Sequence, residues 1–216
     1  MKNNKKYSHI LWDWNGTLFD DVDWCMQCMN TMLSARGMNT LPDRAAYHRA
    51  FCFPIIDYYQ NVGFDFAREP FEVLAAEYIA LYHAQDTGHC PLHPHALQVL
   101  QALTSKNIRQ AVLSASEINN LRAQMRVFGI EPYFADILGL SDVYAKSKVA
   151  IGLDYIARNH VTAALLVGDT IHDAEVAQAL GADCLLIASG HQSTEQLLAC
   201  GVPVVDDITR VPDYIL

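Results

Sequence analysis

Acidic side chains directly follow two separate apolar runs of this sequence. Asp13 comes after the run 10–12, and Asp169 follows the run 163–167, with Asp173 four residues later. In open parallel sheets, ligands bind outside the carboxyl ends of the strands, so these acids are expected to share one edge. Crowded carboxylates repel one another unless a cation joins them, and hard oxygen donors favour Mg²⁺. The alternative, in which Asp169 and Asp173 only cap a helix, leaves Asp13 unexplained.

A lysine is expected at the same edge. Lys148 follows Ser147, whose hydroxyl is a suitable helix N-cap. A cation at the start of a helix is disfavoured by the helix dipole, so its position needs another reason. We therefore predict that the Lys148 ammonium points to the edge, where it can hold both Asp13 and a phosphate. Lys146, two residues earlier, is the competing candidate.

The apolar runs predict a parallel sheet between helices. They are continuous and do not alternate with polar residues, so each strand is expected to be covered on both faces. Helical patterns alternate with the runs from about residue 108 onward, as in α/β doubly wound, Rossmann-like folds. Ser114 and the group Ser189-Gly190-His191 each follow a run and are expected at the same edge as Asp13. The predicted strands are 9–12, 108–113, 137–140, 163–167, 184–188 and 202–205, and the helices between them are 119–128, 148–159 and 174–180.

A helical segment separates the first strand from the others. Helical patterns cover 22–36, 43–51 and 69–83, and no convincing strand lies among them. We expect an inserted all-helical domain over 21–89 and a discontinuous α/β core formed by 1–20 and 90–216. The alternative is a helical subdomain placed without regard to the site.

Composition restricts the class of protein. The net charge of −9 makes a broad nucleic-acid surface unexpected, although a small basic pocket remains compatible with it. No apolar run approaches the roughly 20 residues that span a bilayer, and the group 10–12 is too short for a signal peptide. Six cysteines in no regular framework favour reduced thiols in a cytoplasmic protein. Cys25 and Cys28 have the spacing of a redox or zinc half-motif, but their flanks favour an ordinary amphipathic helix. Cys90, His93 and His95 favour a linker over a metal site.

The motifs together resemble those of a known family. The segment "DWNGTLFD" at 13–20 is similar to the first motif, D-x-D-G-T-x-x-D, of the haloacid dehalogenase (HAD) superfamily of phosphohydrolases. Ser114, Lys148 and "GDTIHD" at 168–173 resemble the second, third and fourth motifs, in family order. The helical segment occupies the place of the cap that closes over the active site in this superfamily. Phosphoglycolate-phosphatase-like members are the most similar.

The resemblance implies a role for each matching residue. Asp13 is the implied nucleophile, which forms an aspartyl-phosphate, and Lys148 is implied to orient it. Mg²⁺ is the implied cofactor, and a small phosphorylated molecule is the implied substrate. Phosphoryl transfer asks mainly for positioning and charge neutralisation, which such a set supplies. The implied phosphate-binding residues are Gly16, Thr17, Ser114 and Lys148, and the implied metal ligands are Asp13, the backbone carbonyl of Asn15, Asp169 and Asp173, the last directly or through water.

Asn15 departs from the family pattern. The second Asp of the first motif acts as general acid and base, and an amide cannot exchange a proton at neutral pH. A contribution of roughly 10²–10⁴-fold is therefore expected to be missing. Four interpretations are open: a slow phosphatase or one selective for good leaving groups; proton transfer by His172 or His191; a phosphate-binding or regulatory protein without turnover; or an engineered Asp-to-Asn change.

Related chemistries fit less well. Phosphonatase-like members use a cap lysine, and no lysine lies between residues 21 and 90. Dehalogenase-like members carry an aromatic residue at the position of Asn15 and need no Mg²⁺, whereas Asp169 and Asp173 are retained here. A mutase would suffer most from losing its acid. We therefore predict a Mg²⁺-dependent phosphatase, with an inactive phosphate-binding homologue as the alternative. Four arginines of the helical segment are candidates for a second anionic group of the substrate, although each also fits an ordinary surface: Arg36, Arg44, Arg49 and Arg68.

Overall fold

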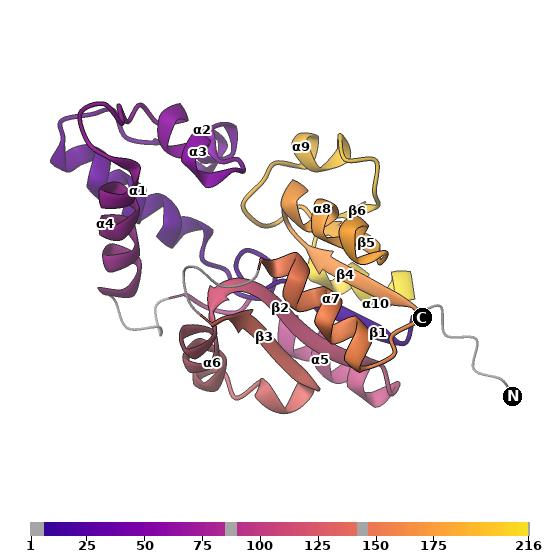
Figure 1. Ribbon diagram of the computed structural model, residues 1–216. Helices are drawn as coiled ribbons and strands as arrows, with labels where there is room; N and C mark the ends of the chain where they lie inside the picture. Colours follow the sequence, from indigo (N-terminus) through magenta and orange to yellow (C-terminus); the bar gives the residue numbers. More distant parts are fainter. Residues whose placement is uncertain (1–6, 85–89, 142–146, 216) are drawn as a thin grey trace, which may run out of the picture.

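Six parallel strands form one sheet in the computed structural model, which describes residues 7–84, 90–141 and 147–215. Their order is β3-β2-β1-β4-β5-β6, and every neighbouring pair is parallel (Figure 1). The chain therefore runs outward in opposite directions from β1, which makes the β1–β4 boundary a topological switch point. The strands are β1 (His9–Trp12), β2 (Arg109–Glu117), β3 (Asp136–Leu140), β4 (Ala164–Gly168), β5 (Asp183–Ile187) and β6 (Val204–Val205).

Successive strand residues pack on opposite faces of the sheet. Ile10 and Trp12 of β1 belong to one apolar core, and Leu11 between them belongs to the other. Helices α5 (Ala96–Ser105), α6 (Ile118–Val127) and α10 (Val211–Ile215) contribute to the first core. Helices α7 (Lys148–Arg158), α8 (Ile171–Leu180) and α9 (Thr194–Leu198) contribute to the second. Burial on both faces explains the continuous apolar runs and confirms the predicted Rossmann-like α/β class.

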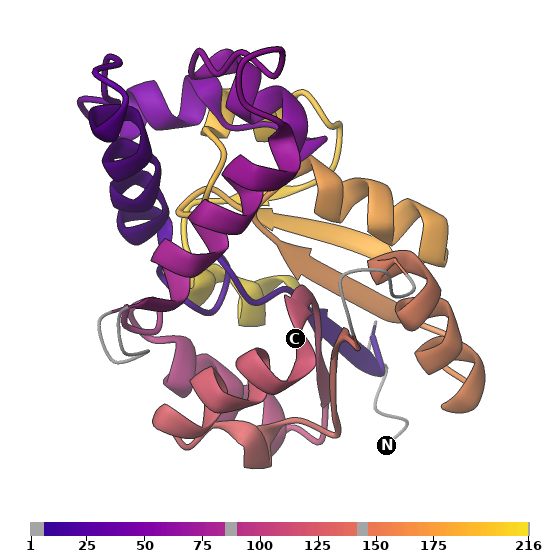
Figure 2. The same cartoon turned by 60° about the vertical axis from the view of Figure 1, so that its left-hand side comes forward.

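The segment between β1 and α5 is helical, as predicted. It comprises α1 (Val22–Ala35), α2 (Arg44–Ala50), α3 (Ile55–Asn61) and α4 (Phe71–Ala84), which we call the helical region. Figures 1 and 2 show these helices as a group of their own beyond one end of the strands. Their buried side chains form a third apolar core, which includes Met29, Tyr47 and Leu74. The predicted boundary at residue 89 lies outside the described residues.

The cysteines and histidines set aside from the sequence lie in ordinary structural positions. Cys25 and Cys28 are buried on α1, and all six cysteines are free thiols. No group of potential metal ligands among the described residues contains both Cys25 and Cys28. None includes Cys90, His93 or His95. In the described part of the chain, no helix is both long and apolar enough for a membrane span.

Several element boundaries differ from the predicted ones. β2 continues past Ser114 to Glu117, with a register shift against β3 between Leu113 and Glu117. α8 begins at Ile171 and not at 174, because the Thr170 side chain caps its first turn. The short helix α3 and the helix α5 were not predicted from the sequence; α5 begins directly after the segment 90–95 that we had interpreted as a linker.

Candidate active site

Three carboxylates meet at the carboxyl edge of the sheet. Asp13 directly follows β1 and Asp169 directly follows β4, and these two strands are neighbours. The Asp13 backbone N–H donates to the carbonyl of Val167 at 2.9 Å, which continues the pairing of the strands to the site. Oxygen atoms of Asp13, Asp169 and Asp173 all lie within 4.8 Å of one another. The predicted convergence of the three acids is therefore present in the structure.

Lys148 lies between two of these acids. Its Nζ atom donates to Asp13 Oδ1 at 2.6 Å and to Asp173 Oδ1 at 2.6 Å. The lysine is the first residue of α7, and the Ser147 hydroxyl caps that helix by accepting from the backbone N–H of Ala150. Burial lowers the pKa of the ammonium, but the two carboxylates more than compensate and raise it overall. Lys148 thus remains charged, as predicted; the competing Lys146 lies outside the described residues.

Asp173 has both of the roles that were weighed as alternatives. Its Oδ2 atom accepts from the backbone N–H groups of Asp169 and Thr170 and from the Thr170 hydroxyl, at 2.7–3.2 Å. It therefore completes a capping box at the start of α8, while Oδ1 binds Lys148. Burial raises the pKa of Asp173, but the charge of Lys148 and these donors lower it overall. Capping and membership of the acidic cluster are compatible because the carboxylate has two oxygens.

Asp13 and Asp169 are held in an environment that disfavours their charges. Burial, and then the neighbouring Asp173 and Asp169, raise the pKa of Asp13 to about 8 although Lys148 opposes them. Burial also raises the pKa of Asp169 to about 6, although its oxygens accept from the Thr17 hydroxyl at 2.8 Å and the His191 backbone N–H at 2.7 Å. When all three carboxylates are ionised, the one ammonium leaves two negative charges, which a divalent cation would neutralise.

The donor set fits Mg²⁺. Carboxylate oxygens on two neighbouring strand ends are the hard ligands that this ion prefers, and it keeps other positions for water and phosphate. The backbone approaches the cluster closely, because a Cβ atom added at Gly16 or Gly190 would collide with the Asp169 side chain. Gly16 also has a positive φ of 72°, which side chains of L-residues rarely adopt. Glycine at positions 16 and 190 thus leaves room for the Asp169 side chain.

The other predicted phosphate-binding residues lie beside this cluster. Ser114 is buried on β2, next to β1, and its hydroxyl accepts from the backbone N–H of Ser116 at 3.0 Å. The Gly16 backbone N–H donates to Phe19 and to Asp21, and the Thr17 hydroxyl donates to Asp169. In this structure the turn therefore orients carboxylates, and direct contact of Ser114, Gly16 and Thr17 with phosphate stays a prediction.

Asn15 is bonded to residues that the sequence reasoning did not identify. Its Nδ2 atom donates to Asp21 Oδ2 at 2.7 Å and to the Tyr82 hydroxyl at 2.9 Å, and its Oδ1 atom accepts from the Ser116 hydroxyl at 2.8 Å. Asp21 is adjacent to the last acid of the first motif, which is the one sequence signal for it. Nothing local indicates Tyr82 of α4 or Ser116 of β2.

His191 is buried between the core and the helical region. Its Nδ1 atom lies 2.7 Å from the Tyr47 hydroxyl and its Nε2 atom lies 3.2 Å from Asp21 Oδ1. Burial lowers the pKa of His191, but the Asp21 carboxylate outweighs it and raises the pKa to about 9. Both ring nitrogens are thus engaged. His172, the other candidate for proton transfer, stacks on Phe53 with 5.0 Å between ring centroids.

A second group of potential metal ligands is a hydrogen-bond network. Asp21, Cys25 and His191 also offer atoms within 4.8 Å of one another. Asp21 Oδ1 already accepts from Gly16 and His191, and Oδ2 accepts from Asn15 and other donors. Burial raises the pKa of Asp21, but His191 and these donors together lower it to about 2. Because donors already satisfy this carboxylate, the group needs no cation.

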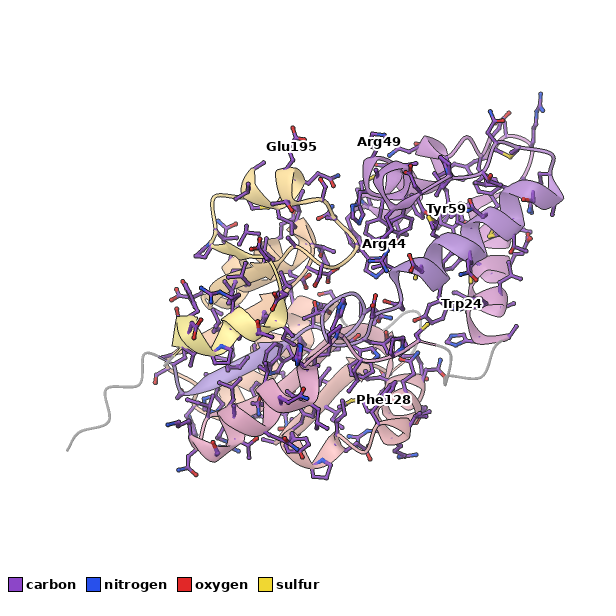
Figure 3. All side chains as sticks on the ribbon, turned by 180° about the vertical axis from the view of Figure 1, so that it is seen from behind. Trp24, Arg44, Arg49, Tyr59, Phe128 and Glu195 are labelled. Atoms are coloured by element: carbon purple, nitrogen blue, oxygen red, sulfur yellow. The ribbon has the colours of Figure 1, made fainter. Side chains whose placement is uncertain are left out.

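Three of the four candidate arginines are paired with carboxylates. Arg36 binds Glu69 and Glu77, Arg44 binds Asp23 and lies 3.7 Å from Asp20, and Arg68 lies 3.4 Å from Asp65. Arg49 is exposed, and Figure 3 shows it at the outer edge of the helical region, away from the sheet. None of the four contacts the acidic cluster among the interactions of the described residues.

Comparisons with known proteins indicate one family. A sequence model for haloacid dehalogenase-like hydrolases matches residues 10–187. The protein named Probable phosphatase IndB of Dickeya dadantii (strain 3937) is 25% identical over 204 residues, which are 92% of this chain and 88% of that one.

Solved structures share the fold. A hydrolase of the haloacid dehalogenase-like family from Streptococcus pneumoniae superposes with a TM-score of 0.82 at 19% identity, over 97% of this chain and 98% of the other. A protein described as a predicted phosphoglycolate phosphatase from Haemophilus somnus 129PT gives a TM-score of 0.78 at 16% identity, over 98% and 99%. At these identities the likeness concerns the fold.

Proposed function

The chain belongs to the haloacid dehalogenase-like hydrolase family, and on that basis we propose that it is a Mg²⁺-dependent phosphatase of small phosphorylated metabolites. The observation that carries this proposal is the meeting of Asp13, Asp169 and Asp173 around Lys148 at the carboxyl edge of the sheet. Such a site supplies a nucleophile and neutralises charge, which are the main requirements of phosphoryl transfer.

Asp13 is the nucleophile of the proposed reaction. Its carboxylate attacks phosphorus, the bond between phosphorus and the leaving oxygen breaks, and an aspartyl-phosphate results. Water then attacks phosphorus, which releases inorganic phosphate and regenerates Asp13. Lys148 keeps Asp13 oriented through the 2.6 Å contact with Oδ1 and adds a positive charge beside the phosphoryl group.

Mg²⁺ would be held by Asp13, the backbone carbonyl of Asn15 and Asp169, with Asp173 bound directly or through water. When bound, the ion would neutralise charge on the phosphoryl oxygens. The free thiols at all six cysteines support the further proposal that the protein works in a reducing compartment such as the cytoplasm.

Residues 21–89, which include the helical region, are proposed to form a cap over the site. Three contacts reach from it to the core beside the site: Tyr47 to His191 at 2.7 Å, His48 to the Gly190 carbonyl at 3.1 Å, and Tyr82 to Asn15 at 2.9 Å. Within its described part, no arginine faces the acidic cluster without a carboxylate partner. We therefore infer a substrate whose one strongly anionic group is the phosphate.

The leaving group of the substrate is constrained by Asn15. Its amide cannot donate a proton to the departing oxygen, so esters of acidic alcohols and acyl phosphates are the preferred substrates. Phenyl phosphate and 4-carboxyphenyl phosphate are a matched pair, because they differ by one anionic group. We expect a higher kcat/KM for phenyl phosphate.

Turnover of these two esters with Mg²⁺ tests the proposal. Activity should disappear in EDTA, return with Mg²⁺ and be abolished by Asp13→Ala. Arg49→Ala, a change at an exposed arginine, is the control and should keep full activity. Turnover that survives Asp13→Ala would refute the nucleophile, and a folded wild-type protein without any turnover of aryl or acyl phosphates would refute the phosphatase.

A further inference from the structure

Every hydrogen-bonding group of the Asn15 side chain has a partner. The two N–H groups on Nδ2 point to Asp21 Oδ2 at 2.7 Å and to the Tyr82 hydroxyl at 2.9 Å. The carbonyl oxygen accepts from the Ser116 hydroxyl at 2.8 Å. These partners come from three places: the turn after β1, helix α4 and strand β2. One amide thus joins the loop that carries Asp13 to the helical region and to the sheet.

Asp21 determines which group fits at position 15. This carboxylate is buried and accepts from the Gly16 backbone N–H at 3.0 Å as well as from His191 Nε2, Asn15 and the Tyr82 hydroxyl. The Tyr82 hydroxyl donates its one proton to Asp21, so it can only accept from position 15. Both neighbours of the Asn15 nitrogen are therefore hydrogen-bond acceptors.

We propose that Asn15 is a positioning residue that joins the nucleophile loop to α4 and β2, and that Asp21 makes an amide the fitted group there. An ionised carboxylate at position 15 would place an oxygen beside Asp21 Oδ2 and the Tyr82 oxygen, neither of which donates to it. Like charges at hydrogen-bond distance are strongly unfavourable when they are buried. The effect of this junction on turnover rests on the proposed phosphatase function, whereas its effect on stability does not.

An exchange of the two side chains would keep the hydrogen bonds among residues 15, 21, 82 and 116, although His191 would lose its charged partner at position 21. In the double variant Asn15→Asp, Asp21→Asn, the nitrogen lies on residue 21 and donates to position 15 and to Tyr82. The Tyr82 hydroxyl then donates to position 15, where the carboxylate still accepts from Ser116. The other oxygen of residue 21 still accepts from Gly16. Residues 15, 21, 82 and 116 thus keep their hydrogen bonds. The donor and acceptor roles of residues 15 and 21 are exchanged, and the pair carries one negative charge as before.

The test compares the single and the exchanged variants by thermal unfolding in EDTA. Asn15→Asp alone should melt about 5 °C below the wild type, since a few kcal/mol corresponds to such a shift in a chain of this size. The exchanged variant should recover part of that loss, since the bonds at the junction return while the charged partner of His191 does not. An Asn15→Asp protein that melts at or above the wild-type temperature would overturn the proposal, as would an exchanged variant that melts no higher than the single one.

The kcat/KM for phenyl phosphate gives a second measurement, which would not differ between the variants if Asn15 had only a structural role. With Mg²⁺ and phenyl phosphate, the exchanged variant should exceed Asn15→Asp by at least about tenfold in kcat/KM, because it combines an acid at position 15 with an intact junction. Equal values for the two variants would contradict the positioning role. If the wild type and all variants are inactive, the phosphatase proposal fails, while the order of melting temperatures still decides on the junction.

Tyr82→Phe and Tyr58→Phe form a matched pair for the case in which Asn15→Asp does not fold. The Tyr82 hydroxyl bonds both Asn15 and Asp21, whereas the buried Tyr58 hydroxyl has no hydrogen-bond partner among the described residues. Tyr82→Phe should lower the melting temperature by about 2–4 °C, and Tyr58→Phe should not lower it. Equal melting temperatures for the two variants would overturn the proposal.

Discussion

Replacement of Lys148 by Met should separate the electrostatics of the site from its shape. Met has a similar unbranched length but no charge, so Asp13 and Asp173 each lose a partner at 2.6 Å. The lysine and both acids are almost completely buried, so water does not compensate for the loss. The variant keeps three neighbouring carboxylates without a cation.

The expected cost follows from the burial of the pair. Removal of one partner of a buried ion pair costs about 3–5 kcal/mol, because the other charge remains desolvated. In a chain of 216 residues, each kcal/mol corresponds to about 2–4 °C in melting temperature. Lys148→Met should therefore melt about 6–20 °C below the wild type in EDTA.

Addition of Mg²⁺ should reduce the difference in melting temperature between Lys148→Met and the wild type. A divalent cation bound to the same carboxylates replaces part of the lost positive charge, so the metal should stabilise the variant more than the wild type. Differential scanning calorimetry with EDTA and with Mg²⁺ measures both shifts. Catalysis should remain impaired with the metal present, since Asp13 is no longer oriented by the ammonium.

Arg49→Met is the control for Lys148→Met, since it removes a positive charge from an exposed position. Its melting temperature should stay within about 2 °C of the wild type. A Lys148→Met protein that melts like the wild type in EDTA would refute the argument. A stabilisation by Mg²⁺ that is no larger in this variant than in the wild type would refute the shared-charge reasoning.

Three further predictions concern the same site. Because the folded-state pKa values of Asp13 and Asp169 are raised to about 8 and about 6, the metal-free protein should lose stability as the pH rises from about 4 to 8; calorimetry in EDTA at several pH values checks this, and a rise in stability over that range would contradict it. Gly190→Ala should lower the melting temperature by about 2–10 °C and reduce turnover, since its Cβ atom would collide with the Asp169 side chain; wild-type values in both assays would contradict the close approach. Tyr47→Phe should lower the melting temperature by about 2–8 °C, because the buried Nδ1 atom of His191 loses its hydrogen-bond partner; an unchanged transition would show that this contact does not stabilise the helical region on the core.

The proposed active site was largely predictable because it depends on local patterns and on one general property of parallel sheets. Each apolar run marks a strand buried on both faces, and the residue after it must emerge at the carboxyl edge. Asp13 and Asp169 were found in this way, Lys148 was found from its position at the start of a helix, and the structure brings the three together. The resemblance of the motifs then indicated the family, which the match over residues 10–187 confirmed.

The roles of single polar side chains needed the tertiary structure. Asn15 looked like a missing acid in the sequence, whereas its fit to Asp21, Ser116 and Tyr82 depends on segments 6, 101 and 67 residues away. A hydrogen bond forms only where donor and acceptor meet in space, and no local pattern specifies such distant partners.

The sequence by itself determined which residues lie at the carboxyl ends of the strands, because the burial of a strand on both faces is visible in its run of apolar residues. Only the tertiary structure decided how the charges are paired. Arg36 is the clearest case: as a candidate for substrate it is indistinguishable in the sequence from Arg49, yet folding places it between Glu69 and Glu77. Charge pairing depends on distances between elements, and those distances are set by the packing of whole helices.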